Sequence, residues 1–419
     1  MSSISHKLPL RTRVAAAVGS AVSETSRRLG RGGGSVVGGR AILAVDPLGL
    51  SRLAAGRAIA LVSGTNGKTT TTSLLRAALS GSGPVATNLL GANLPPGLAA
   101  ALAEMPDAPF AALEVDEAWL GKVVDATSPR AVALLNLSRD QLDRNNEVRM
   151  LASAWRRTFD RTSRQEAVTV VANADDPMVV WGAGLAEDVR WIGAGLPWTD
   201  DAAGCPACGG RIQFSEGGDW ACGNCDFRRP PLDAWLESGA IVRADGSRTD
   251  LRVSLPGRAN LANAAMALSV AEVLGCDESS AAAGLSEVKE VVGRYASVSV
   301  GSIAARLLLA KNPAGWLEVF DILRPPPVPA VVAINARIAD GRDPSWLWDV
   351  PFERFAGRLV IATGERSRDL AVRLRYAGVE HRREDDLLKA VVLAAEAGCS
   401  DVDVVANYTS FQQMRALLA

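Results

Sequence analysis

The sequence predicts an α/β protein built from two successive open sheets, and three observations support this fold class. Short apolar runs alternate with helical stretches in the first half of the chain, as expected for parallel strands covered on both faces. A glycine-rich loop separates the first apolar run from a helix predicted over residues 69–80. After a stiff proline-rich segment at residues 324–329, the alternation resumes in a shorter form, which indicates a second, smaller Rossmann-like unit.

The apolar runs give the order of the predicted strands. Those of the first sheet lie at residues 58–63, 110–115, 131–135 and 168–172. Those of the second lie at residues 331–334, 359–362 and 402–406. We expect an N-terminal arm (1–50), a nucleotide-binding domain (51–296) with an insertion at 203–229, and a C-terminal α/β domain (297–419).

The N-terminal arm has its own pattern. A surface helix is predicted over residues 12–29, because Gly19 and Ser20 interrupt the apolar stretch that a signal peptide would need. Residues 30–39 are rich in glycine and are predicted to form a flexible approach to the first domain.

Composition disfavours several classes of protein. The formal net charge is -1 and there are only three tyrosines, so neither electrostatics nor base stacking favours a nucleic-acid partner. No apolar run reaches the roughly 18 residues needed to span a bilayer. Four of the six cysteines form two CxxC pairs rather than a disulfide framework, so we expect a cytoplasmic protein.

The strongest motif is a phosphate loop, which reads Gly64-Thr65-Asn66-Gly67-Lys68-Thr69-Thr70. It stands between a predicted strand and a predicted helix, where backbone N–H groups and the helix N-terminus attract phosphate oxygens. Lys68 is expected to reach the β- and γ-phosphates, and the Thr69 hydroxyl is expected to bind Mg²⁺. The general pattern places a glycine five residues before Gly67, but that position is Val62, so this loop is a variant.

The insertion carries a second strong motif. Cys205 and Cys208 form one CxxC knuckle and Cys222 and Cys225 form another, with thirteen residues between the two pairs. Two such knuckles are typical of one tetrahedral Zn²⁺ held by four thiolates, which is a closed structural site rather than a catalytic one. The sequence therefore predicts a structural zinc ribbon.

The variant loop and the motifs after it resemble the Mur ligases and the folylpolyglutamate synthases. Glu114 matches the family's second magnesium-binding acid, and Arg294 lies where the family places an arginine near the phosphates. Gly257, Asn260 and Asn263 resemble the family's adenine-contacting segment. Further matching segments are 87–93, 136–143 and 173–177. The resemblance implies the central domain of a Mur ligase with an inserted four-cysteine zinc ribbon, followed by a smaller Rossmann-like C-terminal domain.

Three departures from the family pattern limit what the resemblance implies. Gln141 replaces a histidine, and the segment 154–157 lacks the lysine that several Mur ligases carbamylate, so magnesium must be held differently or by fewer protein ligands. Only about 55 residues precede the strand that leads into the phosphate loop. We therefore do not expect the N-terminal domain that grips a UDP-linked substrate.

The C-terminal third narrows the resemblance to the ATP-using subunits of lipid II isoglutaminyl synthases. The segments that carry it are 309–315, 340–349, 364–366 and 407–409. The resemblance implies ATP-dependent amidation of the D-isoglutamate α-carboxyl in the lipid II stem peptide, at the inner membrane face. Ammonia would come from a GatD-like glutaminase bound as a heterodimer, and Asp349 would complete the partner's Cys–His pair.

Other interpretations stay open at this stage. The tryptophan-bearing loop at 340–349 either meets a ligand or partner or completes the domain core with its indole rings. A folylpolyglutamate synthase-like amino-acid ligase shares the phosphate loop. A non-catalytic ATP-binding scaffold, with the ribbon as its interaction module, is compatible with Gln141 and the missing lysine.

Overall fold

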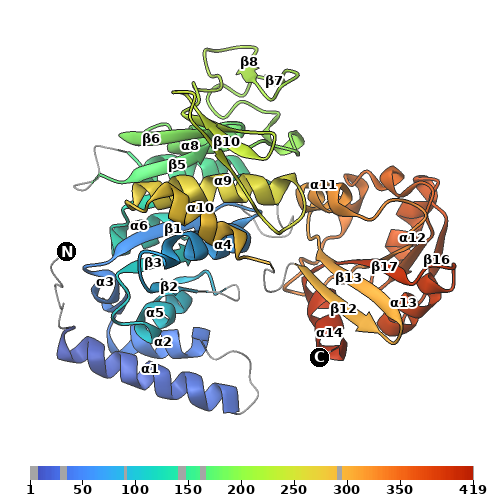
Figure 1. Cartoon of the computed structure of the whole chain (residues 1–419), viewed down its shortest axis with the longest axis horizontal. Coiled ribbons are helices and arrows are strands. Elements are labelled where there is room, and N and C mark those ends of the chain that lie inside the picture. The colour runs from blue at the N-terminus through green and yellow to red at the C-terminus, as the bar shows by residue number, and fades with distance from the viewer. Residues whose placement is uncertain are drawn as a thin grey trace. The chain divides into compact units, whose positions relative to one another are not determined.

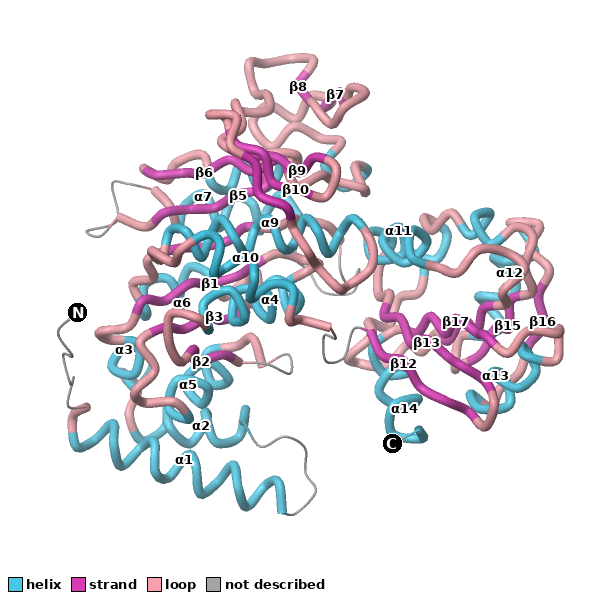
Figure 2. Tube along the Cα trace, in the orientation of Figure 1, coloured by secondary structure: helices cyan, strands magenta, loops and turns pink. Residues whose placement is uncertain are grey.

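The computed structural model of the chain describes residues 8–28, 35–88, 92–139, 148–160, 167–289 and 295–418. These residues form two compact units (Figure 1). The first unit takes in the described residues of 1–137, 147–255 and 259–289, and the second takes in those of 138–146, 256–258 and 290–419. Both are α/β units with layered helices and strands (Figure 2), which confirms the predicted fold class.

The first unit is built on a nine-stranded sheet with the order β11-β10-β9-β6-β5-β4-β1-β3-β2. Its strands are β1 (Ala58–Ser63), β2 (Val85–Thr87), β3 (Phe110–Glu114), β4 (Ala131–Leu134), β5 (Thr169–Asn173), β6 (Asp188–Gly193), β9 (Ala234–Glu237), β10 (Ala240–Arg243) and β11 (Arg248–Asp250). All neighbours from β2 to β9 run parallel, whereas β9, β10 and β11 run antiparallel.

Helices cover both faces of this sheet, which is why the central strands are apolar throughout. They are α3 (Gly49–Ala54), α4 (Lys68–Ser80), α5 (Pro95–Glu104), α6 (Leu120–Thr127), α7 (Val148–Thr158), α8 (Pro177–Ala183), α9 (Arg258–Val273) and α10 (Glu278–Ser286). Side chains of β1 alternate between the faces: Ile59 and Leu61 join the core that α3 and α5–α8 cover. Alternate apolar residues buried on opposite faces are the mark of a covered parallel strand.

The N-terminal region is a pair of helices, α1 (Leu10–Arg28) and α2 (Ser35–Val45). The predicted surface helix is confirmed as α1. The predicted flexible approach over residues 30–39 is wrong for residues 35–39, which begin α2. Gly38 and Gly39 are needed there because a Cβ at Gly38 would overlap the Ser23 hydroxyl, and one at Gly39 would overlap the carbonyl of Pro96. The glycines therefore permit close helix packing rather than flexibility.

The second unit is a six-stranded sheet with the order β12-β13-β17-β14-β15-β16. Its strands are β12 (Tyr295–Val300), β13 (Ile303–Leu309), β14 (Ala330–Ala333), β15 (Val360–Thr363), β16 (His381–Arg383) and β17 (Asp401–Ala406). Its helices are α11 (Pro313–Ile322), α12 (Ser367–Tyr376), α13 (Leu387–Ala395) and α14 (Tyr408–Leu418), with short 3₁₀ turns η3 (Ser345–Trp348) and η4 (Phe352–Phe355). Only β12 is antiparallel to its neighbour.

Two cores hold the second sheet. Trp316 of α11 packs edge-on against Phe352 and Phe355 of η4 on one face. Phe411 and Met414 of α14 pack with α13 on the other face. The unit thus has a covered parallel sheet of its own.

Candidate active site

The phosphate loop joins β1 to α4 and depends on two glycine conformations. Gly64 has φ +145° and Gly67 has φ +84°, both in the region that side-chain-bearing residues avoid. At Gly67 a Cβ would also stand 2.5 Å from the Asn263 side-chain oxygen. Lys68 is the first residue of α4, so the loop delivers backbone N–H groups to a helix N-terminus. This cradle suits a phosphate group.

Asn136 braces the loop from the end of β4. Its side-chain oxygen accepts a hydrogen bond from the Asn66 N–H at 2.9 Å, and its amide donates to the Asn66 carbonyl at 3.1 Å. The Asn136 carbonyl also accepts from the Thr65 N–H at 2.9 Å. These three bonds fix the middle of the loop before any phosphate binds, which lowers the ordering cost of binding.

Lys68 forms a buried ion pair that the sequence motifs did not reveal. Its Nζ lies 3.1 Å from Glu117 Oε2 and also donates to the carbonyls of Gly64 and Thr65. Lys68 is 5% exposed and Glu117 is 9% exposed. The indole N–H of Trp155 donates to the Glu117 carbonyl at 3.0 Å and so fixes its backbone. The signal that could have revealed Glu117 is its place in the sequence, three residues after Glu114 and at the same edge of the sheet.

Thr69 and Glu114 lie together on the neighbouring side of the loop. The Thr69 hydroxyl donates to Glu114 Oε2 at 2.8 Å, and Asn88 holds the Glu114 backbone through two hydrogen bonds of 2.8 Å each. Asn93 reaches the other carboxylate oxygen at 3.5 Å. A hydroxyl and a carboxylate side by side are oxygen ligands that Mg²⁺ prefers. The residues present are therefore suited to magnesium.

The remaining nucleotide candidates have different positions. Thr70 is buried in the first turn of α4. Asn260 lies in α9, and one turn further on Asn263 is the residue that faces Gly67. Arg294 lies outside the described residues, as does the segment 140–147 with Gln141.

Asp349 lies in the second unit, directly after η3. Its carboxylate is 38% exposed and stands 3.4 Å from the Arg139 guanidinium. The two tryptophans of this loop differ: Trp346 is 7% exposed and belongs to the core, whereas Trp348 is 55% exposed. Trp348 packs edge-on against Tyr376 with ring centroids 5.4 Å apart. The loop therefore both completes the core and presents an exposed aromatic pair.

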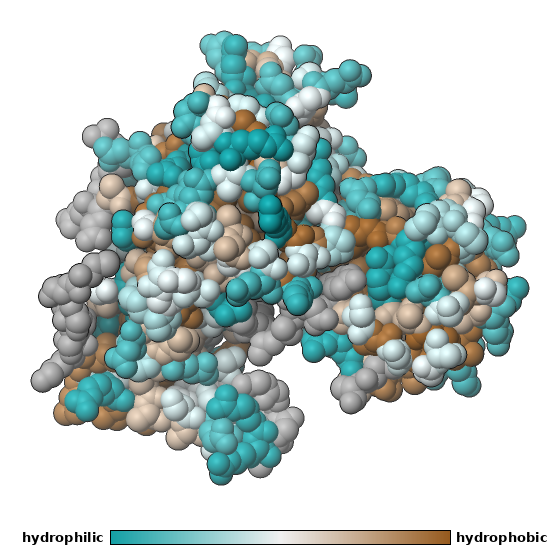
Figure 3. All heavy atoms as spheres, viewed as in Figure 1, coloured by the Kyte–Doolittle hydropathy of each residue, from teal (hydrophilic) through white to brown (hydrophobic). Residues whose placement is uncertain are grey.

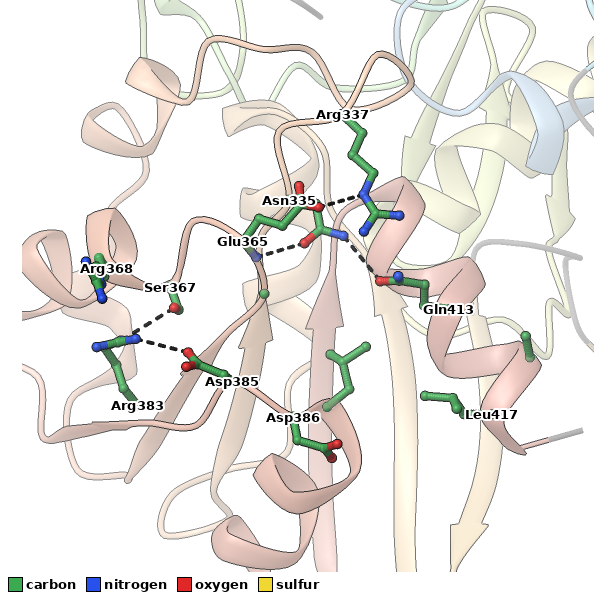
Figure 4. Close-up of a pocket in the computed structure, with 13 residues that line it drawn as sticks. Asn335, Arg337, Glu365, Ser367, Arg368, Arg383, Asp385, Asp386, Gln413 and Leu417 are labelled. Carbon is green, nitrogen blue, oxygen red and sulfur yellow. Dashed lines mark hydrogen bonds and ion pairs between the residues drawn. The ribbon is translucent and has the colours of Figure 1, made fainter.

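A cavity of 830 Å³ opens at the carboxyl ends of β14, β15 and β16, where ligands of open α/β sheets usually bind (Figure 4). Most of the charged side chains that line the cavity form ion pairs with one another. Arg337 contacts Glu365 at 2.8 Å, and Arg383 contacts Asp385 at 3.0 Å. Of the segments singled out in the sequence, Gly364 and Glu365 line this cavity.

The four predicted zinc ligands converge in the insertion. The hairpin of β7 (Ile212–Phe214) and β8 (Trp220–Cys222) brings Cys205, Cys208, Cys222 and Cys225 together, with all four sulfurs within 4.8 Å of one another. The Asn224 side-chain amide and the Gly210 N–H lower the pKa of the Cys208 thiol to about 6. Clustered sulfurs that accept N–H bonds are suited to a Cys₄ zinc site.

The insertion is attached to the main sheet by a few specific contacts. The Trp220 indole N–H donates to the Ala174 carbonyl at 2.9 Å, and Arg229 pairs with Asp175. Next to them, Asp176 caps α8 and accepts a bond from the Leu137 N–H at 2.8 Å. Burial raises the pKa of Asp176 to about 6. The ribbon thus rests on the turn that follows β5.

Comparison with known proteins identifies the class. Residues 62–195 match the Mur ligase middle domain, and residues 309–411 match the MurT ligase C-terminal domain. The fold is similar to that of a pseudomurein peptide ligase type C from Methanothermus fervidus, with TM-score 0.68 and 20% identity over 86% of this chain and 78% of that one. The fold and the phosphate loop place the chain among the Mur ligases.

Two curated relatives show which family of Mur ligases the chain belongs to. The lipid II isoglutaminyl synthase (glutamine-hydrolyzing) subunit MurT of Streptococcus pneumoniae is 30% identical over 94% of this chain and 93% of its own. The protein of the same name from Staphylococcus aureus (strain COL) is 28% identical over 85% of this chain and 86% of its own. The chain belongs to the MurT family.

Proposed function

We propose that this protein uses ATP to amidate the D-isoglutamate α-carboxyl of the lipid II stem peptide, giving D-isoglutamine through an acyl phosphate. Membership of the MurT family supports the substrate and the product, because the relatives are named as subunits of lipid II isoglutaminyl synthase. The observation that carries the proposal is the buried group of Lys68, Thr69, Glu114 and Glu117 around the glycine-rich loop.

The loop residues divide the work of phosphoryl transfer. The N–H groups of residues 64–70 and the Lys68 ammonium hold the phosphates, while Thr69 and Glu114 hold Mg²⁺, which neutralises phosphate charge when bound. The substrate carboxylate attacks the γ-phosphorus in line, the bond to ADP breaks, and an acyl phosphate forms. Ammonia then attacks the acyl carbon, phosphate leaves, and the nitrogen loses a proton. Asn260 and Arg294 orient the nucleotide.

Ammonia comes from a separate glutaminase subunit. Hydrolysing glutamine needs a cysteine activated by a nearby histidine. The chain has two histidines, of which His6 lies outside the described residues and His381 bonds through Nδ1 to the Val379 carbonyl at 2.8 Å. Trp348 and Tyr376 form an exposed aromatic pair of the kind that anchors partners. Asp349, beside them, completes the partner's Cys–His pair.

Nitrogen-source dependence is the direct test of this function. With ATP and the lipid II substrate, the chain alone is expected to release phosphate and form the carboxamide when ammonium is supplied. Glutamine is expected to serve only when the glutaminase subunit is added. Mass spectrometry of the product distinguishes a carboxamide from an added amino acid. Incorporation of glutamate would indicate a folylpolyglutamate synthase-like ligase, and absence of carboxylate-dependent phosphate release would indicate a scaffold.

Glu117 is predicted to be a positioning residue for Lys68. Glu117→Ala removes the carboxylate that pairs with the Lys68 ammonium at a distance of 3.1 Å and holds it in place. Because small displacements of a catalytic group are costly, kcat for ATP turnover should fall by roughly tenfold to a hundredfold. Glu117→Gln keeps an acceptor oxygen and should recover part of the loss.

The matched control for Glu117 is Glu104→Ala, which removes an exposed carboxylate at the end of α5. That variant should behave like the parent in kcat and in affinity for a fluorescent ATP analogue. If Glu117→Ala is equally unaffected while folded, Glu117 does not position Lys68.

A further inference from the structure

Helix α1 has two opposite faces with different chemistry. The face toward α2 and the main unit carries small buried residues at helical spacing: Thr12, Ala15, Gly19, Ser23 and Ser26. The opposite face carries Leu10, Val14 and Val18, which are 73%, 48% and 39% exposed. Ala17 and Ala21 continue this exposed apolar stripe at the same spacing. The larger apolar side chains of α1 therefore face outward, which is the opposite of the usual arrangement in a surface helix.

The α1–α2 hairpin also lies in the N-terminal part of the sequence, which carries a net positive charge. Residues 1–57 contain nine Lys or Arg and two Asp or Glu, a net charge of +7, so the remaining residues carry -8. Arg11, Arg13 and Arg40 are exposed on these helices. In Figure 3, apolar atoms gather beside hydrophilic ones along the lower edge, where Figure 1 shows the start of α1.

We propose that the outward face of α1, with the arginines of the α1–α2 hairpin, docks on the surface of an anionic lipid bilayer. This inference rests in part on the proposed function, because the proposed substrate is lipid-linked. An apolar stripe flanked by arginines matches a membrane interface, where apolar side chains enter the acyl boundary and guanidinium groups meet anionic headgroups. A second copy of the same face would bring like charges together.

The docking is peripheral rather than membrane-spanning. Among the described residues, every helix falls short of the length or the apolar character needed to cross a bilayer. The 19 residues of α1 extend roughly 28 Å, long enough to lie along the interface. Each basic residue close to an anionic surface strengthens binding by roughly fivefold at moderate ionic strength.

Vesicle co-sedimentation without nucleotide or substrate tests this surface by itself. The full chain is expected to pellet with vesicles of phosphatidylglycerol and phosphatidylcholine, and to remain in solution with phosphatidylcholine alone. Arg13→Glu with Arg40→Glu should weaken binding by roughly tenfold or more, as should Val14→Ser with Val18→Ser. The control is Arg248→Glu with Arg252→Glu, which changes the charge equally at the exposed β11 end and should bind like the parent.

Two results would overturn the proposal: a parent protein that ignores anionic vesicles, or binding that the helix variants leave unchanged. If the parent protein is a dimer and the Val14→Ser with Val18→Ser variant is a monomer, the exposed face of α1 serves self-association instead. Amidation of a lipid-free substrate analogue should be the same in all variants. If the parent fails to amidate that analogue but binds vesicles, the proposed function is wrong and the docking surface stands.

Discussion

Lys68→Ala is expected to lower carboxylate-dependent ATP turnover by roughly a thousandfold. The ammonium is the one positive side chain that the described loop offers to the phosphates, and it is almost fully buried. In a site with little water, a fixed charge stabilises a developing phosphate charge far more than it would in solution. Phosphate release measured with and without the substrate carboxylate gives the effect directly.

The controls for Lys68 separate chemistry from folding. Lys68→Ala leaves Glu117 buried without its partner, which costs about 3–5 kcal/mol when a buried pair is broken. Combining Lys68→Ala with Glu117→Gln removes both charges, so the double variant should recover thermal stability but no activity. Lys122→Ala removes an exposed lysine above Trp119 and should match the parent. Near-parental turnover by a folded Lys68→Ala protein would refute the assigned site.

Removing zinc is expected to unfold the ribbon and leave the phosphate loop in place. Metal analysis should find one zinc per chain, and Cys208→Ser should lose it. Structural zinc sites contribute about 10–16 kcal/mol of apparent binding energy near neutral pH, far more than the small β7–β8 hairpin supplies by packing. Hydrogen exchange should therefore rise sharply over residues 203–229.

The matched thiol controls are Cys276→Ser and Cys399→Ser, which lie outside the cluster and should keep the zinc. ATP turnover of the zinc-free protein should remain within a few-fold of the parent, because no cysteine lies among the loop contacts described above. A zinc-free protein that kept its ribbon protected from exchange, yet lost the chemical step, would make the zinc catalytic.

Much of the first sheet was predictable because its strands are covered on both faces. The predicted strand over residues 58–63 is β1 itself, and the next three predicted strands deviate from β3, β4 and β5 by a residue or two at their ends. The strands β2, β6 and β9–β11 were missed, since short or half-buried strands lack long continuous apolar runs. The helix α2 was missed because paired glycines usually indicate a loop, and only the tertiary packing against Ser23 and Pro96 reveals their use.

The candidate site was partly predictable for a related reason. Lys68 and Thr69 come after β1 and Glu114 ends β3, and these two strands are neighbours, so sheet topology brings the three residues together. Glu117 lies in the loop between β3 and α6 rather than at a strand end, and its contact with Lys68 depends on how Trp155 holds that loop. Asn263 faces the phosphate loop only because α9 turns it toward Gly67, which single-sequence patterns do not specify.

The nine-stranded sheet ends on both sides in strands of three residues. At one border stands β2, and at the other β11, whose Arg248 and Asp250 are exposed and charged. Short or charged border strands make poor templates for adding another backbone, and so they resist edge-to-edge aggregation. The molecule can therefore keep a large open sheet at cellular concentrations without recruiting neighbours into ribbons or fibrils.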